Sequence, residues 1–126
     1  ILDYPEPVGH QEHWYVHGGA NSFRDELAPA RTFGILKEVQ TLEQMGLANG
    51  GRLDNCILIG DQGVINPPLR FEDELARHKV LDLIGDLYLL GRPIRGRVTA
   101  ERTGHGDNIA LVRALQEGMG LQATVH

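Results

Sequence analysis

The stretch RHKVLDLIGD, residues 77–86, constrains the fold more than any other part of the sequence. Its apolar residues recur at helical spacing, which predicts a long helix from about residue 72 to residue 90. On an ideal helix, Asp82 and Asp86 lie roughly 40° and 80° around from His78, so the three share one strip. Apolar side chains fill most of the remaining circumference, so we expect the helix to be buried. A buried carboxylate without a partner is costly, which raises the question of what this strip binds.

A metal ion is one answer for the first two members of the strip. An imidazole and a carboxylate one helical turn apart can bind the same divalent cation, so His78 and Asp82 are candidate metal ligands. The alternative is a His–Asp pair on a solvated helix edge. Two protein ligands do not complete a zinc site, so the spacing predicts only part of one. Asp86 is too far along the helix to be an obvious third ligand, and we interpret it as a carboxylate that orients a catalytic histidine or as a surface acid.

Two further residues near this strip are candidates for chemistry. His105 lies between two glycines in the loop TGHGDN, which leaves its imidazole accessible for proton transfer; the alternative is an ordinary loop histidine. Lys79 flanks the strip and is suited to contact an anionic substrate group, unless it is simply solvated. The other histidines and the cysteine predict no chemistry. We interpret His10, His13 and His17 as surface residues without acidic neighbours, and Cys56 as a core thiol.

The remaining segments predict an α+β fold. An amphipathic pattern over residues 35–50 predicts a helix that ends at Gly46 or Asn49–Gly50, and a final helix is expected from a cap at Asp107 or Asn108 to about residue 117. The order of elements predicts a two-layer sandwich in which two main helices cover a sheet, in a single domain over residues 1–126. Strands are predicted at residues 12–18, 55–60, 64–66 and 93–100, with a strand or short bridge at residues 22–27. The strands at 55–60 and 64–66 are predicted to form a hairpin around the turn GDQG.

Composition narrows the classes of function. The chain has 126 residues, 41% of them hydrophobic, which suits one globular domain. Its net charge of -5 argues against nucleic acid as a partner. The sequence has no apolar run long enough to be a transmembrane segment, and the single cysteine favours a reducing, cytoplasmic setting. Because the chain begins at Ile1 rather than methionine, we expect it to be a piece of a longer protein.

Four blocks of sequence resemble a known enzyme family. These blocks are APARTFG at 28–34, GGRLDNCILIGD at 50–61, LRFEDELARHKVLDLIGDLYLLG at 69–91 and TGH at 103–105. In this order and spacing they resemble the second half of the bacterial UDP-3-O-acyl-N-acetylglucosamine deacetylases. The resemblance implies a zinc amidohydrolase of lipid A biosynthesis, which removes acetate from a UDP-linked acyl glucosamine. It also implies an α+β fold with a small βαβ insert and an N-terminal domain as partner.

The resemblance also implies roles for individual residues. His78 and Asp82 match the two zinc ligands of the helix motif. His105 matches the catalytic histidine, which stabilises the oxyanion or protonates the leaving amine, and Asp86 matches the aspartate that supports it. The substrate-binding positions that the resemblance implies are Thr32 and Phe33 for the sugar and acyl chain, Tyr4 for the uracil ring, and Lys79 and Arg102 for the anionic groups.

The sequence departs from the family pattern at three points. Ile35 stands where phenylalanine is common, so the acyl passage is expected to differ in shape, and Arg102–Thr103 replaces lysine–serine. The third zinc histidine and the general-base glutamate lie in the family's first domain and have no counterpart here. We therefore expect the chain alone to be inactive, as an excised domain or one piece of a split or cleaved enzyme. The alternatives are a non-catalytic nucleotide-sugar-binding module and self-association through an exposed inter-domain face.

Overall fold

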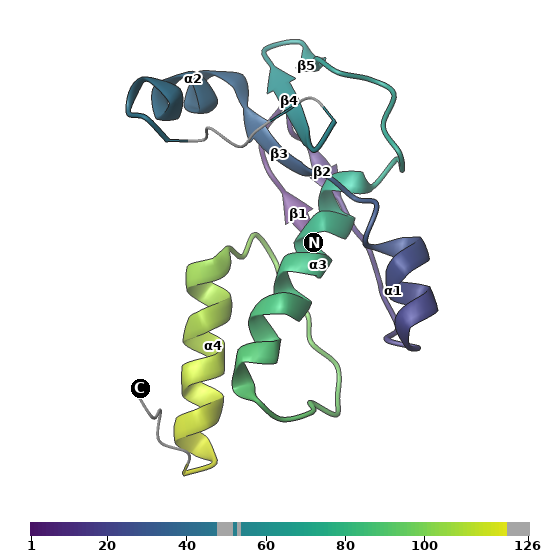
Figure 1. Ribbon diagram of the computed structural model, residues 1–126, viewed down its shortest axis with the longest axis vertical. Coiled ribbons are helices and arrows are strands. Elements are labelled where there is room, and N and C mark those ends of the chain that lie inside the picture. Colours follow the sequence, from purple (N-terminus) through teal and green to yellow (C-terminus); the bar gives the residue numbers. More distant parts are fainter. Residues whose placement is uncertain (48–51, 53, 121–126) are drawn as a thin grey trace.

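The described part of the chain, residues 1–47, 52 and 54–120, folds into four α-helices and two small β-sheets in a computed structural model (Figure 1). The predicted α+β class is confirmed. The strands are divided between two sheets rather than gathered in one. In chain order the elements are β1 Leu2–Asp3, β2 His10–Gln11, α1 Ala20–Glu26, β3 Thr32–Ile35, α2 Leu36–Gln44, β4 Cys56–Gly60, β5 Gly63–Val64, α3 Glu74–Leu87, the 3-10 turn η1 Tyr88–Leu90 and α4 His105–Gly118.

The three-stranded sheet contains the expected βαβ insert. Strands β3 and β4 are parallel and are joined through α2, with Thr32 opposite Cys56 and Ile35 opposite Ile59. Strand β5 returns antiparallel to β4, which confirms the hairpin predicted around the turn GDQG. Helix α2 is also confirmed, and Gly46 follows its end with a φ of 76°. The alternative stop at Asn49–Gly50 lies outside the described residues.

The hydrophobic core lies where the two sheets meet the start of α3. Strand β1 pairs antiparallel with β2 and brings Leu2 toward β4. In β4 the side chains alternate, so that Ile57 and Ile59 point inward and are fully buried. Leu75, in the first turn of α3, completes this cluster. The chemistry-bearing strip of α3 therefore begins directly beyond the core.

The long helix is confirmed, but it is less buried than its sequence predicts. Only its first turn is fully buried, and further along most side chains are half-exposed. Tyr88 and Leu89, in the 3-10 turn that extends it, are 74% and 61% exposed. The helix ends at Gly91, whose φ of 73° is the left-handed conformation expected of a helix stop. Helix α4 packs beside the C-terminal half of α3 (Figure 1), and in the described part of the chain no helix is long and apolar enough to cross a membrane.

Three of the predicted strands are wrong. Residues 12–18 and 93–100 form no regular strand, and residues 22–27 lie mostly in α1. An alternating pattern makes a strand only where a second strand donates and accepts backbone hydrogen bonds. Instead, Trp14 and Val16 remain 62% and 85% exposed. The end of the segment after α3 is bonded to the start of the chain. The Ile1 ammonium donates to the Ala100 carbonyl oxygen at 2.8 Å, and the Arg102 N–H donates to the Ile1 carbonyl oxygen at 3.0 Å.

Two local boundaries also differ from the predictions. Residues 32–35 form β3, for which no strand was predicted. The final helix starts at His105, two or three residues before the predicted caps. Asp107 does act on this helix start, because its carboxylate accepts the Gly104 N–H at 3.0 Å. Asn108 is instead buried inside the helix and faces α3.

Candidate active site

His78 and Asp82 face each other along α3. The Nε2 atom of His78 lies 3.3 Å from Oδ1 of Asp82, and each side chain is 18% exposed. The other ring nitrogen, Nδ1, lies 2.9 Å from the Ala30 carbonyl oxygen. Since a carbonyl oxygen only accepts, Nδ1 must carry the hydrogen, and the lone pair of neutral His78 is then on Nε2, facing the carboxylate. Nε2 of neutral His78 and the Asp82 oxygen are thus two electron-pair donors that one shared metal cation could bind.

The donor set fits part of a zinc site. One imidazole nitrogen and one carboxylate oxygen are ordinary zinc ligands, and the bond from Nδ1 to a backbone carbonyl is the usual way in which a zinc-binding histidine is oriented. Among the described residues, no group of three or more His, Cys, Asp or Glu side chains is placed to hold a metal. Since structural and catalytic zinc ions take three or four protein ligands, His78 and Asp82 would need ligands from elsewhere.

Asp86, one turn further along α3, contacts the start of α4. Its Oδ2 accepts from His105 Nδ1 at 2.7 Å and from Asn108 Nδ2 at 3.0 Å. Burial alone would raise the pKa of Asp86, but the hydrogen bonds from Asn108 and His105 outweigh it and hold that pKa below the ordinary value. The carboxylate is therefore ionised at neutral pH. It fixes the His105 hydrogen on Nδ1, while the ring itself is 66% exposed.

The structure places His105 in the first turn of a helix rather than in a glycine loop. The Asp86 carboxylate accepts from its Nδ1 at 2.7 Å, which leaves Nε2 as the ring nitrogen that can meet a ligand. The side chain is 66% exposed and lies beside the strip of His78, Asp82 and Asp86.

Four of the predicted substrate-binding residues form two pairs, each of a cation and an aromatic ring. The guanidinium carbon of Arg102 lies 4.7 Å from the centre of the Tyr4 ring, and Lys79 Nζ lies 5.7 Å from the centre of the Phe33 ring. Both are cation–π distances. Arg102 also has a φ of 49°, in the left-handed region that non-glycine residues rarely adopt. Thr32 is exposed at the start of β3.

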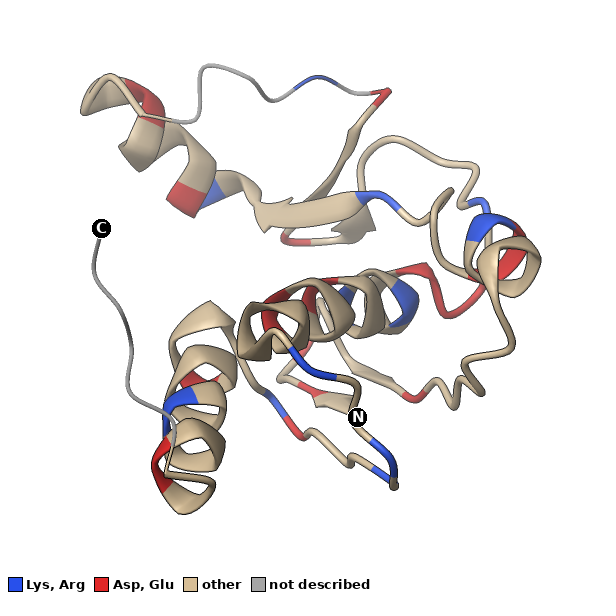
Figure 2. Ribbon diagram, turned by 60° about the horizontal axis from the view of Figure 1, so that its bottom comes forward, with Lys and Arg blue, Asp and Glu red and all other residues tan. Residues whose placement is uncertain are grey.

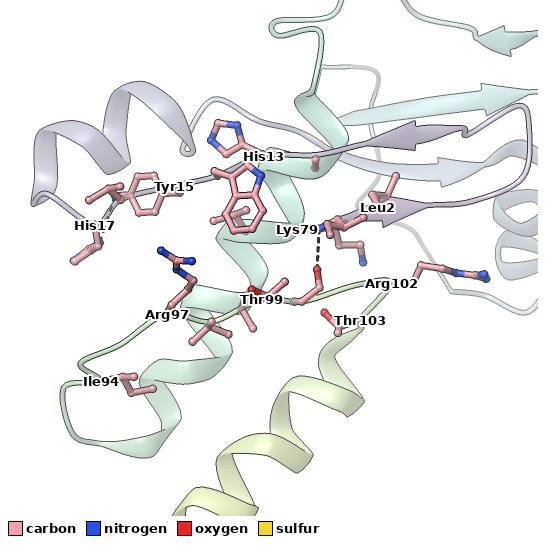
Figure 3. Close-up of a pocket in the computed structure, with 18 of the residues that line it drawn as sticks. Leu2, His13, Tyr15, His17, Lys79, Ile94, Arg97, Thr99, Arg102 and Thr103 are labelled. Atoms are coloured by element: carbon pink, nitrogen blue, oxygen red, sulfur yellow. Dashed lines mark hydrogen bonds between the residues drawn. The ribbon is translucent and has the colours of Figure 1, made fainter.

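Tyr4, Lys79 and Arg102 line one cleft. Its walls are α3, the start of the chain as far as His17, and residues 94–103 (Figure 3). The cleft has a volume of about 700 Å³. Its lining includes four basic side chains, and none of the described residues that line it is aspartate or glutamate. On α3, by contrast, acidic and basic residues are interspersed (Figure 2). The cleft is therefore suited to an anionic ligand, and the other predicted site residues lie outside it. The basic residues are Lys79, Arg95, Arg97 and Arg102.

The interpretation of the N-terminal histidines was partly wrong. His10 and His17 are exposed, as predicted, but the side chain of His13 is only 10% exposed. Its Nδ1 lies 2.8 Å from Asp73 Oδ2, and Nε2 lies 3.7 Å from Glu26. Acidic neighbours are also present at His10, which contacts two carboxylates. The partner Asp73 of His13 could not be read from the histidine spacing, because it is 60 residues away in the chain.

Cys56 is half-buried at the start of β4. Burial raises the pKa of its thiol, and the opposing effect of the nearby Arg31 charge is smaller. A raised pKa leaves less thiolate, which is the nucleophilic form. The geometry therefore favours the interpretation of Cys56 as a packing residue.

Sequence reasoning missed an ion pair that lies next to the candidate metal ligands. Arg31 and Glu74 are buried, and the Arg31 Nε lies 2.9 Å from Glu74 Oε2. Arg31 follows Ala30, whose carbonyl orients His78, and precedes Thr32. The only available signal in the sequence was the acidic cluster at the start of the long helix, which is also the ordinary pattern of a helix N-terminus.

Comparison with known proteins gives a consistent family. The family model of LpxC, UDP-3-O-acyl N-acetylglycosamine deacetylase, matches residues 1–117. The chain is 47% identical over 113 residues to the UDP-3-O-acyl-N-acetylglucosamine deacetylase of Myxococcus xanthus, covering 89% of the chain and 36% of that protein. For the Syntrophotalea carbinolica enzyme of the same name the identity is 49% over 115 residues, or 90% of the chain and 37% of that protein. The chain thus spans little more than a third of the length of these curated relatives.

Proposed function

The chain belongs to the UDP-3-O-acyl N-acetylglycosamine deacetylase family, and on this premise we propose that it is the C-terminal domain of a zinc-dependent deacetylase. The substrate is a UDP-linked acyl glucosamine, and the reaction hydrolyses its acetamide in the cytoplasmic steps of lipid A biosynthesis. The observation that carries the proposal is the His78–Asp82 pair, with Nδ1 of the imidazole bonded to a carbonyl and Nε2 facing a carboxylate.

In this proposal His78 and Asp82 hold the zinc ion together with ligands from the N-terminal domain. When bound, zinc acts as a Lewis acid on the amide carbonyl and lowers the pKa of water. The Ala30 carbonyl accepts from Nδ1, so that Nε2 is the nitrogen whose lone pair would bind the metal. Asp82 contributes a negative charge that offsets the charge of the cation. Both side chains are largely shielded from solvent, which strengthens their attraction for a cation.

In this proposal His105 transfers a proton or stabilises the negative charge that develops on the substrate oxygen, and Asp86 orients it. Asp86 holds the imidazole through Nδ1, which leaves Nε2 as the atom that meets the substrate. Protonated at Nε2, His105 donates a hydrogen bond to the oxygen on which negative charge develops, or gives its proton to the leaving amine. The ionised Asp86 orients the ring for these roles by accepting from Nδ1.

The cleft beside α3 binds the nucleotide part of the substrate. Tyr4 presents a ring for the uracil, and Lys79 and Arg102 supply positive charge for the diphosphate. The contact of Arg102 with the Tyr4 ring holds the guanidinium before substrate arrives. Thr32 and Phe33, on β3, lie toward the sugar and acyl chain in this proposal.

Activity requires the N-terminal domain, because two protein ligands and no general base do not make a complete zinc hydrolase. The test mixes the chain with a separately produced N-terminal domain and zinc, and measures acetate release from the UDP-linked substrate. We expect no turnover by either part alone and turnover by the mixture. His105→Gln in the mixture should lower kcat by about a hundredfold or more. No acetate release from a zinc-loaded complex of both parts contradicts the proposal.

Metal binding by the chain itself is tested separately by NMR. Zinc titrated into the chain should shift the imidazole resonances of His78, and His78→Ala should abolish this binding. His10→Ala is the matched control, because it removes an exposed histidine on β2 that contacts two carboxylates but lies outside the strip on α3. Zinc that shifts His10 and leaves His78 unchanged contradicts the assignment of the ligands.

The second candidate function is a nucleotide-sugar-binding module without catalysis, which the basic cleft alone would support. Both functions predict that UDP binds the chain. Under either, Arg102→Gln should weaken UDP binding roughly tenfold, since a hydrogen bond to a charged group contributes about 1.5 kcal/mol or more. The two are separated by the zinc titration and the acetate assay, because the binding module needs neither.

A further inference from the structure

The pair formed by Arg31 and Glu74 is the most deeply buried charged contact described in the protein. Glu74 has no exposed surface and Arg31 is 9% exposed. Glu74 Oε2 accepts from both the backbone N and the side-chain Nε of Arg31, each at 2.9 Å, and Oε1 accepts from Arg31 Nη2 at 3.1 Å. Oε1 also accepts the Arg70 backbone N–H at 2.7 Å. One carboxylate thus binds four donors.

Hydrogen bonds from this pair and from Arg70 fix the backbone on both sides of Ala30. On its C-terminal side, the Arg31 N–H donates to Glu74. On its N-terminal side, Arg70 Nη1 donates to the Pro29 carbonyl at 2.8 Å. Ala30 is itself buried, and its N–H donates to the Leu27 carbonyl at 3.0 Å. The Ala30–Arg31 peptide, whose carbonyl accepts from His78 Nδ1, is therefore held through its N–H, and the Pro29–Ala30 peptide before it is held through both its carbonyl and its N–H.

A buried ion pair of this kind is not explained by stability alone. Desolvation of two charges offsets much of their attraction, and apolar replacements of similar volume are often as stable. What an apolar pair cannot do is bind two backbone N–H groups and fix the direction of a neighbouring carbonyl. The pair links the first turn of α3 to the segment that leads into β3, and the candidate metal ligand His78 lies one turn along that same helix.

We propose that Arg31 and Glu74 are positioning residues for His78. By fixing the Ala30 carbonyl they keep the hydrogen of His78 on Nδ1 and the lone pair on Nε2, directed at Asp82. The same contact sets the start of β3, and hence Thr32, relative to the helix that carries the ligands. That this positioning serves metal binding rests on the proposed function. What Arg31 and Glu74 determine directly is the tautomer and orientation of the His78 imidazole.

The test compares the tautomer of His78 by long-range 1H–15N NMR of the ring nitrogens at pH 8, where an ordinary imidazole is neutral. The variant is Arg31→Met combined with Glu74→Gln, which removes both charges together so that neither is left unpaired in the core. The matched control is Arg77→Gln. Arg77 also joins a carboxylate, Asp73 at 2.6 Å, and a backbone carbonyl, Glu26 at 3.2 Å, so that its hydrogen bonds hold a different part of the chain.

We expect the parent and the control to show the hydrogen on Nδ1 alone, and the double variant to show a mixture of Nδ1–H and Nε2–H forms. Zinc affinity of the double variant, measured at His78, should fall by roughly 10- to 100-fold, as is typical when the groups that orient a metal ligand are lost. A folded double variant that keeps a single Nδ1–H form overturns the proposal. So does a control that loses the tautomer to the same extent, because general loosening would then explain the effect.

If the double variant does not fold, Arg31→Lys decides the question. It keeps the positive charge beside Glu74 but loses the forked contact with Glu74 and the Pro68 carbonyl. If folded Arg31→Lys shows a mixture of the Nδ1–H and Nε2–H forms of His78, the proposal is supported; if it shows the Nδ1–H form alone, the proposal is refuted. The outcome is separate from the proposed function. If zinc does not shift His78 in the parent chain, the metal assignment fails, while the tautomer comparison still decides the role of the pair.

Discussion

Asp82 and Asp86 lie one turn apart on the same helix, and their partners give them different chemistry. Asp82 faces a ring nitrogen that carries no hydrogen in the neutral form, so the pair accepts a proton or a cation. Asp86 faces two donors, His105 and Asn108, so it is ionised and acts on the histidine. The difference arises because the Nδ1 hydrogen of His78 is bound by a backbone carbonyl, whereas the Nδ1 hydrogen of His105 is bound by Asp86 itself.

Asp86→Asn should lower the free energy of unfolding by about 1 to 2 kcal/mol at pH 7, because the charge-assisted bonds to His105 and Asn108 are lost. The folded-state pKa of Asp86 lies below its ordinary value, so its contribution is present above the ordinary pKa and is lost as the pH falls through the folded one. Urea denaturation of parent and variant at pH 7 and pH 3 should therefore show a difference that shrinks in acid.

The control for this variant is Asp61→Asn. Asp61 is 75% exposed and pairs with Lys37 at 3.4 Å on the surface. Exposed ion pairs contribute little to stability, so we expect a change close to zero at both pH values. Equal effects of the two substitutions would show that Asp86 has no special contact with α4 in solution.

At the scale of elements, β3 and α2 approach each other too closely for a side chain at position 34. A Cβ on Gly34 would lie 2.7 Å from Cγ2 of Val39, a distance that real Cβ atoms do not adopt. Val39 is β-branched and cannot rotate away freely. The sharp passage from strand to helix at Ile35–Leu36 thus depends on glycine for lack of a side chain rather than for its backbone freedom.

Gly34→Ala should therefore destabilise the protein by about 1 to 3 kcal/mol, the usual cost of an overpacked contact. Adding Val39→Ala removes the methyl group that clashes. In a double-mutant cycle by chemical denaturation, the second substitution should recover part of the loss. Strictly additive effects of the two substitutions would contradict the close approach of β3 and α2.

Alanine substitutions at two glycines, one inside α3 and one at the end of its 3-10 extension, are expected to change stability in opposite directions. Gly85 lies inside α3, where a Cβ would meet nothing within 4 Å, so Gly85→Ala should stabilise the helix by about 1 kcal/mol. Gly91 ends the extension with a φ of 73°, so Gly91→Ala should destabilise it by about 1 kcal/mol. Thermal unfolding of both variants checks the signs, and two shifts in the same direction would contradict the observed helix end.

For the whole molecule, three buried or half-buried carboxyls link stability to pH. Burial alone would raise the pKa of Asp73, Glu74 and Asp86, but hydrogen bonds from neighbouring donors outweigh it and lower each value below the ordinary 3.8 or 4.5. As the pH falls, the unfolded chain takes up protons before the folded chain does. Their stabilisation is therefore complete above about pH 5 and is lost as the pH falls through the lowered folded values.

We expect the unfolding temperature to fall by roughly 10 °C or more between pH 5.5 and pH 3, since each carboxyl contributes on the order of 1 kcal/mol. The contribution of His10 to stability depends on pH in the opposite direction. Hydrogen bonds that the His10 ring donates to Asp3 and Glu12 raise its pKa above 6.5, so its contribution is present below that value and is lost as the pH rises through the raised one. Differential scanning calorimetry from pH 3 to a pH above the raised His10 pKa checks both, and an unfolding temperature that stays constant between pH 5.5 and pH 3 contradicts the carboxyl pairs.

The sequence by itself determined the elements and contacts that depend on neighbours within a few residues. Helical spacing predicted α2 and α3, and the apolar run with a glycine turn predicted the hairpin of β4 and β5. The pair of His78 and Asp82 was predicted for the same reason, because residues four apart on a helix face one another whatever surrounds them.

Only the tertiary structure decided the contacts between distant segments. The alternating segments at 12–18 and 93–100 lack partner strands, since backbone pairing depends on where another strand lies and not on the pattern itself. The partners of His13, 60 residues away, and of Arg31, 43 residues away, likewise follow from how α3 packs against the N-terminal segments. Burial then makes these distant contacts strong, because charges and donors removed from water must find their partners within the fold.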